Sequence, residues 1–139
     1  TLEPEVKIVA YDWYLFSLLV FKDFSFKISQ EAISFYRQYD SNTLGMSFEI
    51  NEDSLQDLIR IKKMHLLALL KYYLRLNRSK LYTIFDDELK DLLELEISLK
   101  VNIRKHDYIS ILNKNIDKIF CGWFSQLISL KKYKELHEN

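Results

Sequence analysis

The stretch that decides the fold reads NEDSLQDLIRIKKMHLLALLKYYLRLNR and runs from Asn51 to Arg78. Apolar residues recur in it at steps of three and four, the spacing that places them on one face of an α-helix. Asn51 is a residue type that caps helix N-termini, and two acids follow it in the first turn. Arg75 and Arg78 lie in the last turn, so the charges match the helix dipole at both ends. We therefore predict one long helix here.

Further helices are predicted on either side of this stretch. They cover Glu5–Phe24, Gln30–Tyr39, Asp86–Arg104 and Asp107–Ile128. The first of them is apolar on nearly all sides, so we expect it to be a central, largely buried helix. The basic segment after Ser129 is expected to fray.

The composition agrees with an all-α protein. The 139 residues include only two glycines and one proline, too few for the many tight turns of a sheet protein. Hydrophobic residues make up 48% and charged residues 29%, with a net charge of zero, which indicates a globular domain and argues against a generic polyanion binder. We expect residues 1–139 to form a single domain, a bundle of about five helices.

Two features bear on location. Cys121 is the only cysteine, which excludes an intramolecular disulfide and a cysteine-cluster zinc site. We interpret it as a buried structural thiol and expect a cytoplasmic protein. The longest uncharged apolar run, Trp13 to Phe21, is far shorter than the roughly 20 residues that span a bilayer, so no membrane association is expected.

Aromatic residues are concentrated in the first three predicted helices. Rings with a polar tip can line a cavity for an apolar small molecule and fix its orientation. We therefore predict a ligand-binding cavity there. Its lining residues would be Trp13, Phe16, Phe35, Tyr36, His65, Leu69 and Tyr72. The alternative is that these side chains simply fill the core.

The last two predicted helices are amphipathic and carry much apolar surface. Such a pair suits a four-helix seam with a second copy of the chain, so we predict a homodimer. The interface residues would be Leu92, Ile116, Phe120, Trp123, Phe124 and Leu127. The alternative is that both helices pack only on the first helix of the same chain.

A basic stripe on the long helix invites a nucleic-acid interpretation. Arg60, Lys71, Arg75 and Arg78 fall on one helical face, as a phosphate-tracking surface requires. We favour a simpler interpretation. The chain turns back after Arg78, so basic residues of this helix meet the acidic start of the next one and the charges neutralise each other.

No catalytic motif is present. The sequence lacks G-x-S-x-G, P-loop and G-x-G-x-x-G patterns, and its three histidines are far apart without metal-ligand spacing. Arg60 and His65 show the R-x4-H spacing of HEPN-type ribonucleases, but Ile61 stands where a polar residue commonly follows the arginine. We interpret His65 as a pocket-lining or core histidine, and we expect no enzyme activity, metal or cofactor.

The order of elements resembles a known family. The segment SQEAISFYRQY, from Ser29 to Tyr39, follows the apolar first helix. It is similar to a Phe-Tyr-Arg-(Glu/Gln)-Tyr-like segment that often stands at this place in the C-terminal domain of TetR-family transcriptional regulators. The matching residues are Phe35, Tyr36, Arg37 and Tyr39. The closing segment IDKIFCGWF, Ile116 to Phe124, resembles the last, dimer-forming helix of that family.

The resemblance implies an all-helical homodimer that binds a small apolar ligand and passes a shape change to an N-terminal DNA reader. The helix-turn-helix of that reader is not among the 139 residues, and no direct nucleic-acid contact is expected from this segment. The alternative function is a small helical protein-interaction module, such as a phage, viral or plasmid immunity protein or a host-factor inhibitor.

Overall fold

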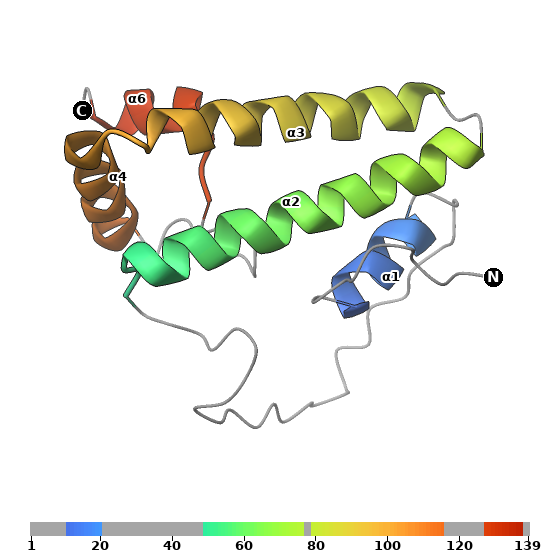
Figure 1. Ribbon diagram of the computed structural model, residues 1–139, viewed down its shortest axis with the longest axis horizontal. Coiled ribbons are helices and arrows are strands. Elements are labelled where there is room, and N and C mark those ends of the chain that lie inside the picture. Colours follow the sequence, from blue (N-terminus) through green and yellow to red (C-terminus); the bar gives the residue numbers. More distant parts are fainter. Residues whose placement is uncertain (1–10, 21–48, 77–78, 116–126, 138–139) are drawn as a thin grey trace, which may run out of the picture.

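The computed structural model describes residues 11–20, 49–76, 79–115 and 127–137, and these residues form helices and no strand (Figure 1). The helices are α1 (Tyr11–Val20), α2 (Glu52–Arg75), α3 (Ser79–Ser98), α4 (Asn102–Lys114) and α6 (Leu130–His137). The predicted all-α class is confirmed. The predicted helix Gln30–Tyr39 lies outside the described residues.

α2 is the central element and begins where the sequence predicts. The side-chain oxygen of Asn51 accepts a hydrogen bond from the backbone N–H of Ser54 at 2.8 Å. The Ser54 hydroxyl oxygen accepts one from the backbone N–H of Asn51, also at 2.8 Å. This capping box satisfies two backbone donors that a helix start otherwise leaves unbonded.

α3 runs antiparallel to α2, and the two form the main layer of the fold (Figure 1). Their apolar faces meet in the core, where the rings of Tyr73 and Phe85 stack with centroids 5.6 Å apart. Deeply buried side chains of these two helices include Leu55, Leu69, Tyr73, Leu92 and Leu95. Burying a leucine contributes about 2 kcal/mol, so this seam supplies much of the stability of the hairpin.

Ion pairs flank the same seam. Lys62 pairs with Glu88 at 2.5 Å, and Lys63 pairs with Glu96 at 2.6 Å. Basic residues of the long helix therefore do meet acidic residues of the next helix, as the sequence suggests. Both of these lysines lie in the middle of α2.

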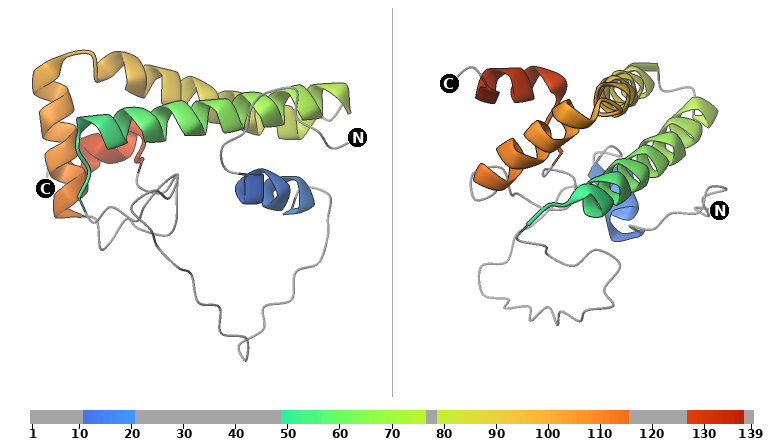
Figure 2. Two further views of the ribbon diagram at one scale, coloured as in Figure 1. Left: turned by 60° about the horizontal axis from the view of Figure 1, so that its bottom comes forward. Right: turned by 60° about the vertical axis from the view of Figure 1, so that its left-hand side comes forward.

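α4 and α6 close one end of the hairpin, and Figure 2 shows α4 crossing the ends of α2 and α3. The side-chain amide of Asn113 accepts a hydrogen bond from the Ile50 N–H at 2.8 Å and donates one to the Ile50 carbonyl at 2.9 Å. The buried Tyr108 hydroxyl donates to the Ile128 carbonyl at 2.7 Å. These bonds fix the segments before α2 and before α6 against α4.

The predicted boundaries of the last two helices are wrong. α3 begins seven residues before the predicted Asp86 and ends at Ser98 instead of Arg104. Its extra N-terminal turns pack Leu81, Tyr82 and Phe85 on the core, and tertiary burial of this kind extends a helix. At its other end Val101 takes an extended conformation, which turns the chain into α4.

The predicted helix Asp107–Ile128 is also wrong in its bounds. α4 spans Asn102–Lys114, and the Asn115 side chain closes its end by donating to the Ile111 carbonyl at 2.9 Å. The segment expected to fray contains α6. That helix forms because Leu130, Tyr133 and Leu136, spaced three apart, pack together against the core.

α1 lies beside α2 at the edge of the fold, so its predicted central position is wrong (Figure 1). Only one stripe of it is covered: Tyr14 and Leu18, four residues apart, are 4% and 2% exposed. Tyr11, Leu15 and Phe16 remain largely exposed. A helix that is apolar all round buries only the side that faces a partner, and the sequence pattern does not say which side that is.

Candidate functional site

A half-open groove of about 610 Å³ lies between α2 and the corner where α3 turns into α4. Its apolar lining residues are Leu55, Ile59, Met64, Leu67 and Leu99. Its polar lining residues are Gln56, Asp57, Arg60, Lys63, Glu96, Lys100 and Lys105. We call this feature the α2 groove.

The spacing along α2 explains why these side chains share one flank. Leu55, Ile59, Lys63 and Leu67 are four residues apart, and such steps stay on one side of an α-helix. Leu55 and Ile59 are buried and form the floor, whereas Leu67 is 43% exposed at the rim. The groove thus has a buried apolar floor and an apolar rim that is exposed to water.

Ion pairs line the middle of the groove. The Arg60 guanidinium bonds the Asp57 carboxylate at 2.8 Å within α2. Lys63 pairs with Glu96 across the α2–α3 seam at 2.6 Å. Both pairs are partly exposed, so each contributes little to stability, but together they hold four of the charged side chains in place.

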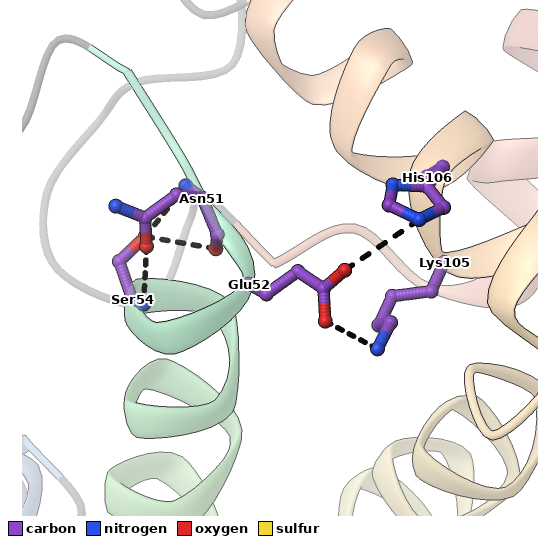
Figure 3. A network of polar contacts seen from close by, with 5 residues as sticks. All are labelled: Asn51, Glu52, Ser54, Lys105 and His106. Atoms are coloured by element: carbon purple, nitrogen blue, oxygen red, sulfur yellow. Dashed lines mark hydrogen bonds and ion pairs between the residues drawn. The ribbon is translucent and has the colours of Figure 1, made fainter.

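A second network stands where α2 begins (Figure 3). Glu52 extends from the first turn of α2 to Lys105 and His106 on α4, with 3.6 Å between its carboxylate and His106 Nε2. The hydrogen bond from Lys105 is the main cause that lowers the pKa of Glu52. Lys105 lines the groove and is therefore already engaged by a carboxylate.

Lys100 differs from the other cations of the groove. It is exposed at the α3–α4 corner, and within the part of the chain that the structure describes it forms no ion pair. The groove lining holds four cations and two anions, a net charge of +2 (4 − 2). Adding Glu52, which pairs with Lys105, leaves +1, and Lys100 carries this uncompensated charge.

The residues predicted to line a ligand cavity lie elsewhere. Trp13 and His65 meet between α1 and α2, with ring centroids 6.2 Å apart in an edge-on arrangement. Leu69 is buried in the core, Tyr72 packs partly against it, and Phe16 is 59% exposed. Phe35 and Tyr36 lie outside the described residues. None of the five described residues lines the α2 groove.

The two candidate sites occupy opposite flanks of α2. His65 and Tyr72 are seven residues apart and face the α1 side, whereas Lys63 and Leu67 face the groove. Lys63 and His65 are two residues apart, which is about 200° around a helix with 3.6 residues per turn. A ligand in the groove would therefore not touch the aromatic residues beneath α1.

The surroundings of His65 fit a core histidine. The Ser17 hydroxyl donates to the Trp13 carbonyl at 2.8 Å, so its oxygen is left to accept from His65 Nε2 at 3.3 Å. This assigns the neutral tautomer with the proton on Nε2. Burial, only partly opposed by Asp12, lowers the pKa of His65 to about 4. The imidazole is uncharged at neutral pH.

Within one chain, the structure does not bring Arg60 and His65 of the R-x4-H spacing together. Arg60 is exposed and engaged by Asp57, while His65 is 5% exposed beneath α1. Five residues correspond to about 140° around a helix, which separates the two side chains. A ribonuclease site would need both on one phosphate.

The predicted dimer residues are described only in part. Leu92 and Leu127 are 4% and 6% exposed and belong to the core of the single chain. Ile116, Phe120, Trp123 and Phe124 lie outside the described residues, as does Cys121. The seam with a second copy stays a prediction.

The described ranges show neither a metal site nor a membrane span. No three histidine, cysteine, aspartate or glutamate side chains gather there as metal ligands would. None of the described helices has the length and apolar character needed to cross a bilayer.

Sequence reasoning missed the groove residues Lys100 and Glu96. Glu96 lies near the end of α3 and Lys100 in the turn that follows it, and both line the groove beside α2. The four-residue repeat from Leu55 to Leu67 was the available signal. This repeat predicts that the four side chains share one side of the helix, but it does not predict that this side is left uncovered by the neighbouring helices.

Fold and site together define the chain as an all-α domain with an amphipathic surface groove. Comparison with protein-family models, with curated proteins and with solved structures found no match. The chemistry of the groove is therefore the basis on which a function is inferred.

Proposed function

We propose that this chain is a ligand-binding helical domain that holds an elongated, mainly apolar small molecule in the α2 groove. The observation that carries the proposal is the groove itself, with its volume of about 610 Å³ and its buried apolar floor. Sites for small molecules typically measure about 300–1,000 Å³ and are lined by apolar side chains with a few polar groups.

The shape of the groove favours an elongated ligand. Its lining follows α2 from Leu55 to Leu67, which are twelve residues apart in the sequence. At 1.5 Å per residue this is about 18 Å. A compact ligand would fill only part of that length.

The exposed apolar rim of the groove favours ligand binding. Leu67 is 43% exposed, and covering the remainder of a leucine side chain is worth about 1 kcal/mol. Contacts with Ile59 on the floor and with the half-buried Met64 would add dispersion energy. Binding would thus remove apolar surface from water without opening the core.

The wider parts of this proposal rest on the sequence. The resemblance of Phe35 to Tyr39 to the sensor domain of TetR-family regulators supports a role in which ligand binding controls transcription. Homodimerisation belongs to the same proposal. A solution mass near twice 16.8 kDa, measured by light scattering after size-exclusion chromatography, would support it, and a monomer would contradict it.

The test of the groove uses a matched pair of leucines. Leu67→Glu places a carboxylate at the apolar rim, whereas Leu74→Glu makes the same change seven residues further on the same face, outside the groove lining. Both side chains are exposed, so both variants should fold. The probe is Nile red, an uncharged dye whose fluorescence rises in apolar sites.

We expect wild type and Leu74→Glu to bind the dye alike, and Leu67→Glu to bind it about tenfold more weakly, because the new charge must be desolvated. Equal binding by all three proteins would contradict the proposal. Equal loss in both variants would contradict it too, since it would indicate adsorption to scattered apolar surface.

A further inference from the structure

We infer that the ligand of the α2 groove carries an anionic group, such as a carboxylate, and that Lys100 binds this group. The inference rests on the proposed function and names the class of its ligand, an amphipathic anion. It is carried by the distribution of charge and apolar surface within the groove.

Charge pairing singles out Lys100. Arg60 is paired with Asp57, Lys63 with Glu96 and Lys105 with Glu52. Lys100 forms no ion pair with any residue in the described ranges, and it lines the groove. An anion can therefore bind its ammonium without breaking an existing ion pair.

A cationic ligand would meet the opposite situation. The groove's carboxylates, Asp57 and Glu96, are already engaged by Arg60 and Lys63. A ligand cation would have to displace one of these partners, and it would face the unneutralised charge of Lys100. The net positive charge, +1 once Glu52 is counted with the lining residues, therefore selects against cations.

The polarity of the groove also gives the ligand a direction. Lys100 lies beside Leu99 at the α3–α4 corner, and the ion pair between Lys105 and Glu52 places this corner at the start of α2. Met64 and Leu67 lie several turns further along α2. The anionic group would thus stand at the corner, and the apolar chain would follow α2 toward Leu67.

The experiment compares three probes that share one apolar chain: laurate, dodecanol and dodecylammonium. Each is titrated calorimetrically into the whole chain below its micelle concentration at neutral pH. We expect laurate to bind about tenfold more tightly than dodecanol, and dodecylammonium to bind most weakly, because a charge-assisted bond to Lys100 is available only to the carboxylate. The preference for laurate should shrink as salt is added.

The variant Lys100→Met should remove the preference for laurate, so that laurate and dodecanol bind with about the same affinity. Lys80→Met is the matched control, since Lys80 is exposed on α3 and outside the groove lining. It should keep the preference. Circular dichroism of both variants verifies that they fold.

The outcomes separate the two claims. If dodecanol and laurate bind wild type equally well, the groove is a ligand site but the inference about charge is wrong. A preference for laurate that survives Lys100→Met also overturns the inference. If no probe binds, the proposed function itself is overturned.

Discussion

Acidification should destabilise this fold through His65. The imidazole is buried beneath α1, and its pKa in the folded chain is about 4 against an ordinary value of 6.5. The unfolded chain therefore binds a proton more readily than the folded one. The stabilising contribution of the neutral ring is present above pH 6.5 and is lost as the pH falls toward 4.

The size of the effect follows from the two pKa values. Their full difference corresponds to about 3 kcal/mol. Between pH 7 and pH 5 the folded ring stays neutral while the unfolded ring becomes charged, which costs about 2 kcal/mol of the free energy of unfolding. For a domain of this size that is a large share of the total stability.

The assay is urea unfolding followed by circular dichroism at both pH values, for wild type and for His65→Leu. The leucine variant keeps an apolar side chain of similar size beneath α1 and has no proton to bind. Its loss of stability on acidification should be about 2 kcal/mol smaller than that of wild type. Carboxylates titrate in both proteins, so the difference between the curves isolates the histidine. Parallel curves would refute a buried, neutral His65.

Further predictions concern the contacts of α4. Asn113→Ala should lower the free energy of unfolding by about 1–3 kcal/mol, because both hydrogen bonds to Ile50 are lost, whereas the exposed Asn102→Ala should change it little in urea titrations. Tyr133 donates to Asp107 at 2.5 Å, and burial raises the pKa of its hydroxyl to about 12. The protonated Tyr133 hydroxyl therefore stabilises the fold below pH 10, and this contribution is lost as the pH rises toward 12. Tyr133→Phe should accordingly reduce the alkaline loss of helicity measured by circular dichroism. An unchanged alkaline transition would contradict the role of this bond.

The long helix was predictable from local signals alone. The cap at Asn51, the acids after it and the regular apolar spacing up to Arg75 all describe the same element. The neighbouring boundaries depend on contacts between distant residues. α3 starts early because Phe85 stacks on Tyr73, and α6 forms because Tyr133 docks on α4. Such contacts do not show in local periodicity.

The position of the candidate site was harder to predict than the fold. The aromatic residues pointed to the flank of α2 that faces α1, where Trp13 meets His65. The groove lies on the other flank, where Leu67 remains 43% exposed. The residues of both flanks of α2 can be identified in the sequence, but residue type alone does not tell which flank a neighbouring helix covers.

The most direct test of the central claim, a ligand site in the α2 groove, is a titration of the isotope-labelled chain with dodecanol, followed by nitrogen–proton correlation spectra. The backbone signals of Gln56, Lys63 and Leu67 should shift with a common affinity, because these residues line the groove. Signals that shift only at Trp13 and His65, with the groove residues unchanged, would contradict the claim and place the ligand beneath α1.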